Sequence, residues 1–265
     1  MKEPKGDLLQ LSFYLPNQTP EIALNMLVKA LLECGANFSG IARGCTLNME
    51  ESGYFIPKAR IYREKQLHVS NFQELQSWLD SEEIRVLEVL MTNASDTTKD
   101  ECVIVTYGSI SDQAARHDTP TVSVLSMGDI FSLARLPISD SKKYAIKAKQ
   151  AGKRTYIRLK SIIEIINPAY GSITIEWPLE VPADLKNDPR SLAFRDFYIS
   201  ESFMGANTVT LLRNLFKGAY IEEMSHGLYI SCTREFNPEG IEVDKKVSPW
   251  NTLSTQVGKI IANAA

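Results

Sequence analysis

The 265-residue sequence lacks the features by which membrane, exported and metal-binding proteins are most readily identified. No apolar run approaches the roughly 20 residues that a membrane-spanning helix requires. The polar N-terminal segment, residues 1–7, is not followed by the apolar run of a signal peptide. Four widely spaced cysteines form no C-x-x-C pair, so nothing indicates a zinc site or a redox dithiol: Cys34, Cys45, Cys102 and Cys232. We therefore expect a soluble cytoplasmic protein with free thiols rather than two disulfides, and no membrane partner.

Common nucleotide-binding and hydrolase motifs are missing as well. The sequence contains no G-x-x-x-x-G-K-[ST], no G-x-G-x-x-G and no G-x-S-x-G. Its three histidines, His68, His117 and His226, share no helix turn, which excludes H-E-x-x-H. These absences argue against the best-marked enzyme classes, and the sequence predicts no metal and no cofactor.

The composition is that of a folded globular protein, with 44% hydrophobic and 23% charged residues and a formal net charge of −3. Apolar residues alternate with polar ones over residues 8–15, which predicts a strand. Thr19-Pro20-Glu21 then predicts a helix start, and Gly35 is placed to end that helix.

Further along, the pattern predicts strands within 38–62 and at 84–91, 102–107, 121–125, 171–177 and 194–199. Helices are expected near 70–79 and 129–135, in a region ending at Asn167-Pro168, at 208–216 and from Ser248-Pro249 onward. Residues 219–224 and 228–233 flank Ser225-His226-Gly227, a short turn whose glycine can take a positive φ, and predict a hairpin. Residues 92–101 are expected to form a loop, and the proline-rich stretch 179–190 is expected to be a loop or an extended connector.

This pattern predicts an α+β fold, with a mixed, largely antiparallel sheet or sheets and packed helices. Pro137 and Ser139 mark a plausible boundary. The expected division is an N-terminal α/β lobe (1–137) and a C-terminal α+β lobe (138–265), with one compact domain as the alternative.

A run of basic residues is the most distinctive charge feature. No acidic residue occurs between Ser141 and Ile163, and the cations of this stretch are Lys142, Lys143, Lys147, Lys149, Lys153, Arg154, Arg158 and Lys160. In an acidic protein such a run creates a local positive field that attracts an acidic protein surface or phosphates. A solvated helix face is the plain alternative. Of the run, we select Lys142, Lys143, Lys147, Lys149, Lys153 and Arg154 as candidate partner-binding residues.

Two further positions are candidate contact residues. Arg195 is embedded among aromatic residues, a combination enriched at binding hot spots and equally common in cores: Phe194, Phe197, Tyr198 and Phe203. Phe236 lies in a turn-forming segment after the hairpin.

Carboxylates occur in adjacent pairs, which favours charged surfaces over active sites. Glu222 and Glu223 cannot serve one site if they lie on a strand, because neighbouring strand residues point to opposite faces. The alternative is a catalytic site assembled from scattered residues, and its candidates are His117, Asp118, Glu176 and Arg195.

Three functional hypotheses follow from these features. The first is a non-catalytic bacterial binding protein of the inhibitor, adaptor or toxin-immunity type, docking on a partner protein with an acidic surface. The second is an enzyme acting on a small molecule through a site without local motifs. The third is a nucleotide-binding or nucleic-acid-binding module that uses residues 142–160.

Overall fold

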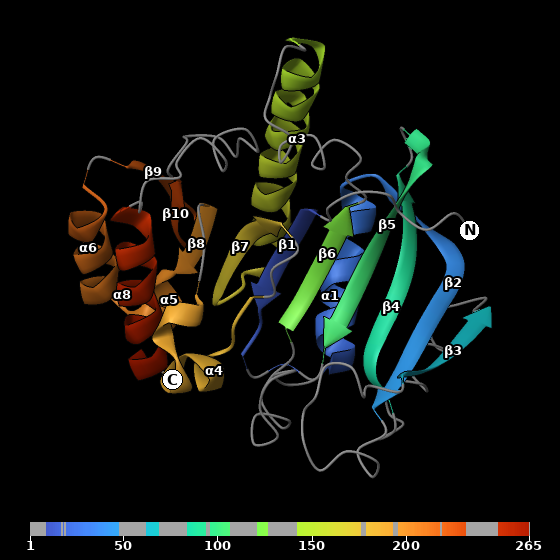
Figure 1. Cartoon of the computed structure of the whole chain (residues 1–265), viewed down its shortest axis with the longest axis horizontal. Coiled ribbons are helices and arrows are strands. Elements are labelled where there is room, and N and C mark those ends of the chain that lie inside the picture. The colour runs from blue at the N-terminus through green and yellow to red at the C-terminus, as the bar shows by residue number, and fades with distance from the viewer. Residues whose placement is uncertain are drawn as a thin grey trace.

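The structure is a computed structural model that describes residues 9–16, 18, 20–47, 62–68, 84–93, 96–106, 121–126, 142–175, 179–192, 196–217, 219–231 and 249–264. The described strands form one ten-stranded sheet, in the order β3-β2-β4-β5-β6-β1-β7-β8-β10-β9 (Figure 1). Every described pairing between these strands is antiparallel. The strands are β1 (Leu9–Tyr14), β2 (Ala36–Leu47), β3 (Tyr62–His68), β4 (Ile84–Asn93), β5 (Asp96–Thr106), β6 (Thr121–Ser126), β7 (Tyr170–Ile175), β8 (Asp196–Ser200), β9 (Tyr220–Met224) and β10 (Gly227–Ser231).

Helices pack on both faces of this sheet. Figure 1 shows α1 and α3 against the sheet and the other helices gathered at its β8–β10 end. The helices are α1 (Pro20–Glu33), α3 (Lys142–Ile166), α4 (Pro182–Asn187), α5 (Glu201–Met204), α6 (Ala206–Leu215) and α8 (Pro249–Ala264), with a 3-10 turn, η3 (Pro189–Ser191). The chain is therefore an α+β protein, as its sequence predicts.

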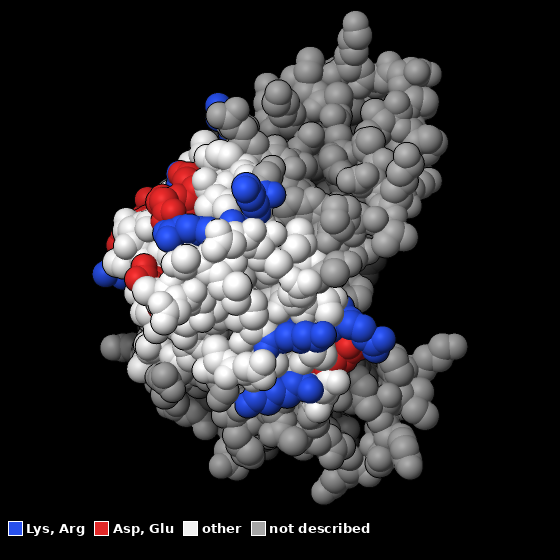
Figure 2. All heavy atoms as spheres, turned by 90° about the vertical axis from the view of Figure 1, so that its left-hand side faces the viewer, with Lys and Arg blue, Asp and Glu red and all other residues white. Residues whose placement is uncertain are grey.

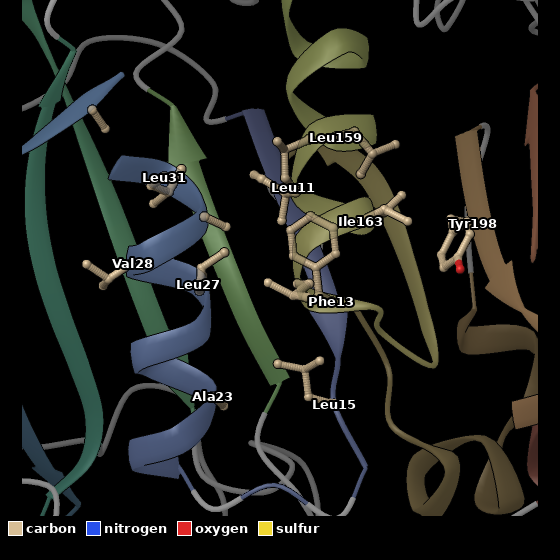
Figure 3. Packing of buried hydrophobic residues seen from close by; sticks show 14 of the residues in the cluster. Leu11, Phe13, Leu15, Ala23, Leu27, Val28, Leu31, Leu159, Ile163 and Tyr198 are labelled. Carbon is tan, nitrogen blue, oxygen red and sulfur yellow. The ribbon is translucent and has the colours of Figure 1, made fainter. Parts of the chain in front are cut away.

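Alternation along the strands divides the core into two layers. In β1, Leu11 and Phe13 pack with α1 and α3, whereas Tyr14 belongs to the layer formed with α4, α6 and α8. β8 alternates in the same way, because Tyr198 joins the first layer and Phe197 the second. Figure 3 shows side chains of β1 lying between α1 and α3. The described residues 11–14 of β1 and all of β8 and β10 are buried on both faces of the sheet, which fixes the register of these strands.

The predicted start of the fold is confirmed in detail. α1 begins at Pro20, which suits the first helical position because a proline has no N–H to satisfy there. Ala23, Leu27 and Leu31 are buried along one side of α1. Gly35 has a φ of 87° and stops the helix, as its position predicts.

Two segments that the sequence predicts as loops are regular structure instead. The stretch 92–101 lies mostly in β4 and β5, where Thr92 pairs with Asp100. The proline-rich stretch 179–190 contains α4, which begins at Pro182, and η3, which begins at Pro189. Both prolines occupy helix starts, where proline is favoured, so the prediction of a loop was wrong.

The predicted hairpin is confirmed, although its glycine has another role. β9 and β10 pair with Met224 opposite Gly227, which leaves Ser225 and His226 as the turn. Gly227 is buried, and an added Cβ would lie 2.1 Å from the Ile199 carbonyl oxygen. The glycine is needed for this close approach of β8 and β10 and not for a positive φ.

Strand pairing continues across the expected boundary at residue 137. β1 from the N-terminal part pairs with β7 along its whole length, from Leu9 opposite Ile175 to Tyr14 opposite Tyr170. The division into lobes at residues 137 and 138 stays a prediction. The predicted helices near 70–79 and 129–135 lie outside the described residues.

Candidate partner-binding surface

Helix α3 carries most of the predicted binding residues, and its two sides differ sharply. Leu159, Ile162 and Ile163 are fully buried against the sheet and α1. On the outward side, Lys153 and Arg154 are exposed and Ile157 retains 52% of its surface accessibility. The helix is amphipathic in the usual sense, with one apolar stripe anchored in the core and the other side available to solvent.

The structure describes part of the predicted site. Lys153 and Arg154 lie side by side on α3 and make no ion pair with any described residue. Lys142, Lys143, Lys147 and Lys149 belong to the first turns of the same helix, where the positions of the side chains are not described. Arg195 and Phe236 lie outside the described residues, and so do His117, Asp118 and Glu176.

Apolar residues on the outward side of α3 were not selected from the sequence. Ile157 and Ile165 lie two turns apart and are 52% and 37% exposed, with Ser161 between them. Ser161 Oγ donates a hydrogen bond of 3.1 Å to the carbonyl oxygen of Ile157. We call the set Lys153, Arg154, Ile157, Arg158, Ser161 and Ile165 the outer face of α3. Its helical spacing, i, i+4 and i+8, is the signal that could have identified it.

A polar cluster fixes α3 against strand β9. Glu222 accepts hydrogen bonds from the hydroxyl groups of Tyr156 and Tyr220, the latter at 3.1 Å, and forms an ion pair with Lys160. The Lys160 ammonium also lies 5.3 Å from the centre of the Tyr156 ring. The Tyr156 ring in turn packs on Tyr229 at 5.0 Å between centroids. The cluster therefore holds the middle of α3 in place and engages Lys160 within the fold.

Ionisation within this cluster follows from burial and hydrogen bonding. Burial alone would raise the pKa of Glu222, but hydrogen bonds from Lys160, Tyr156 and Tyr220 bring it below its usual value. Burial, followed by the neighbouring Glu222 carboxylate, raises the pKa of Tyr156 well above that of an ordinary tyrosine. Glu222 is thus a carboxylate and Tyr156 a neutral donor near neutral pH.

The Glu222–Lys160 pair is expected to contribute modestly to stability. Its side chains are 22% and 35% exposed, so solvent screens part of the attraction. Glu222→Gln keeps an acceptor for the tyrosines and should lower the free energy of unfolding by about 1 kcal/mol. A double-mutant cycle with Lys160→Met, measured by urea unfolding, should give a coupling of about 0.5 kcal/mol. A coupling of zero would show that the pair adds nothing to the tyrosine hydrogen bonds.

The neighbouring glutamate serves a different helix, as strand geometry predicts. Glu223 forms a two-point ion pair with Arg213 of α6, at 2.8 and 3.0 Å. Glu222 reaches α3, so the two carboxylates leave β9 on opposite faces of the sheet. They cannot form the paired carboxylates of a glycosidase.

The aromatic cluster around Arg195 is core in the part that the structure describes. Phe197 and Tyr198 are fully buried in β8. The ring centroids of Phe203 and Tyr170 lie 5.9 Å apart. Tyr229 donates a hydrogen bond to the buried carboxylate of Asp196 in the adjacent strand. Phe197 and Tyr198 therefore stabilise the sheet and are not available to a partner.

A second carboxyl pair, at the start of α4, is expected to make stability pH-dependent. Burial and the nearby Asp184 raise the pKa of Glu180 to about 7. Because the folded state then holds a proton that the unfolded chain releases near pH 4.5, stability should fall as the pH rises from about 4.5 to about 7. Urea midpoints of the wild type and Glu180→Gln at about pH 5 and about pH 8 test this expectation. The variant should lose this part of the pH dependence; identical profiles would contradict it.

Within the described ranges, no group of three His, Cys, Asp or Glu side chains could hold a metal ion. None of the described helices combines the length and the apolar content needed to cross a bilayer.

Comparisons with known proteins give little. No family model matches the chain, and no curated protein matches it. Among solved structures, the fold is similar to Pseudomonas aeruginosa T6SS protein PA0821, at 10% sequence identity and a TM-score of 0.46. That alignment covers 97% of this chain and 74% of the other. A likeness of this size carries no functional argument.

Proposed function

We propose that the chain is a non-catalytic bacterial binding protein of the inhibitor, adaptor or toxin-immunity type, working in the cytoplasm. It docks on a partner protein through the outer face of α3. The observation that carries this proposal is the pairing of exposed cations, Lys153 and Arg154, with the exposed apolar side chain of Ile157. Apolar contact supplies binding energy, while surrounding charge steers the encounter and selects the partner.

The fixed position of the helix supports the proposal. The side of α3 opposite the cations is buried in the core, and the Glu222 cluster ties it to β9. A surface held in this way loses little conformational entropy on binding, because its backbone is ordered beforehand. Lys160 is already engaged with Glu222, which leaves Lys153 and Arg154 as the better candidates for the partner.

The test is capture of a partner by the tagged full chain from its native host. We expect a single stoichiometric protein to be retained by the wild type at about 50 mM salt and reduced at about 300 mM. Charge reversal in Lys153→Glu/Arg154→Glu should weaken its binding by about 100-fold, as measured by titration calorimetry with the purified partner.

A matched control comes from another cation on the molecule. Lys259 is exposed on α8, away from α3, and Lys259→Glu should bind the partner as the wild type does. Full capture by the Lys153/Arg154 variant would refute the proposal. Retention of nucleic acid in place of a protein, lost on raising salt, would favour the nucleic-acid hypothesis instead.

A further inference from the structure

Helix α3 is much longer than the strands on which it packs. Its 25 residues span about 37 Å, whereas the six residues of β7 span about 20 Å. The described core residues of α3 begin at Tyr156 and lie in its second half. Figure 1 shows the first half of α3 extending past the ends of β1 and β7. Within the part of the chain that the structure describes, the first half of the helix therefore projects beyond the edge of the sheet (Figure 1).

Charge on this projection has one sign. The sequence from Lys142 to Ile163 contains no acidic residue, and Lys153 and Arg154 are exposed where the projection begins. The Glu222 carboxylate belongs to β9, and it pairs with Lys160 in the second half of α3. No described acidic side chain pairs with Lys153 or Arg154. An acidic surface on the partner would complement these two exposed cations.

The α6 and α8 side of the molecule offers a contrast. α6 contains one charged residue, Arg213, and α8 contains one, Lys259. Figure 2 shows this side as a broad uncharged surface between two groups of charged side chains. Leu211 of α6 is 54% exposed there. Charge complementarity with an acidic partner thus points to α3 and not to this side.

We infer that the partner presents a concave acidic groove that receives the projecting first half of α3. This inference rests on the proposed function and specifies the partner site. A convex helix buries several of its sides in a groove, but only one side on a flat surface. Carboxylates lining such a groove complement a helix that has cations at eight positions and no acid of its own over residues 142–163.

Crosslinking from opposite sides of α3 distinguishes a partner groove from a flat partner surface. Ala148 and Gln150 are two residues apart on α3, which separates them by about 200° around the helix axis. A photo-crosslinking amino acid is placed at each position in the full chain, with Leu211 as the control position. Crosslinks to the protein captured by the wild type are then mapped by mass spectrometry.

A groove predicts crosslinks from both Ala148 and Gln150 to one acid-rich concave region of the captured protein, and none from Leu211. Lys153→Gln/Arg154→Gln should weaken binding about tenfold without changing the thermal midpoint, and raising salt from about 50 to about 300 mM should weaken it by a similar factor. Crosslinks from only one of the two positions, or to a flat or basic region, would contradict the inference of a groove. Docking through α3 would still stand. Capture that survives Lys153→Glu/Arg154→Glu would instead overturn the proposed function.

Discussion

Replacing Gly258 by alanine is expected to destabilise the protein by about 3 kcal/mol. In an ordinary helix this exchange stabilises by roughly 0.5–1 kcal/mol, because glycine loses more backbone entropy than alanine on folding. At Gly258 the same exchange should lower the free energy of unfolding instead of raising it. α8 packs so closely on η3 that an added Cβ would lie 2.4 Å from the carbonyl oxygen of Pro189 and 3.2 Å from its carbon.

Relief of that overlap requires the backbone to move, because the obstructing atoms belong to a carbonyl group and not to a flexible side chain. η3 and α8 would have to separate, which would loosen the buried side chains of Leu192 and Val257 nearby. We expect a lower urea midpoint with an unchanged slope, because the same surface is exposed on unfolding.

Gln256→Ala provides the matched control on the same helix. Gln256 is exposed, so its exchange should change the free energy of unfolding by less than about 0.5 kcal/mol. A Gly258→Ala variant as stable as this control, or more stable than the wild type, would show that α8 and η3 are not in such close contact.

Elements whose boundaries are set by local chemistry could be predicted from the sequence. The β1–α1 unit has an alternating strand, Pro20 at the helix start and Gly35 at its end, and all three are found as expected. The end of α3 at Ile166, just before Asn167-Pro168, is likewise a local steric effect of proline. In each case the residues that decide the structure are neighbours in the chain.

The loop prediction for the α4 region was wrong because proline has two local roles, in turns and at helix starts. Pro182 and Pro189 favour a loop by composition, yet each begins a short helix. The deciding partner of Pro182 is Asp184, whose carboxylate accepts a hydrogen bond from the backbone N–H of Val181 at 3.5 Å. A proline followed closely by an acidic residue predicts a helix start as well as a turn.

The loop prediction for residues 92–101 was wrong because strand pairing, and not local composition, decides the structure there. Residues 92–101 are polar and contain no apolar alternation, so their composition favours a loop. Both strands nevertheless continue into this stretch, with Met91 opposite Glu101 and Thr92 opposite Asp100. Pairing that begins among the apolar residues of β4 and β5 extends outward, and backbone hydrogen bonding outweighs local preference.

The candidate site could be predicted only in its sequence-local part. The basic run is visible in the chain, and the exposure of Lys153 and Arg154 is consistent with it. The engagement of Lys160 could not be foreseen, because its partner Glu222 is 62 residues away. Contacts at such separation depend on strand order, which residue patterns do not reveal.

Two isoleucines of α3 provide the second large expected effect. Ile163 is fully buried between α3 and the sheet, and Ile163→Ala removes three buried carbon atoms from a closely packed layer. We expect a loss of about 3 kcal/mol in the free energy of unfolding, from lost apolar burial and from the cavity left behind. Figure 3 shows Ile163 beside Leu159 on α3.

Ile157→Ala is the same substitution on the same helix, about two turns earlier and on the outer face. Its side chain is 52% exposed, so the free energy of unfolding should change by less than about 0.5 kcal/mol. Binding should respond in the opposite way. Ile157→Ala should weaken affinity for the captured protein about tenfold, whereas folded Ile163→Ala should bind nearly as the wild type does.

Urea unfolding and titration calorimetry on both variants separate the two sides of the helix. Large destabilisation from Ile163 with a binding loss confined to Ile157 means that one side of α3 builds the fold and the other contacts the partner. Equal stability losses would place Ile157 in the core, contrary to its exposure, and an unaffected affinity would leave the cations alone as the determinants of docking. Because the chemical change is identical at both positions, any difference between the variants reports the environment of the side chain.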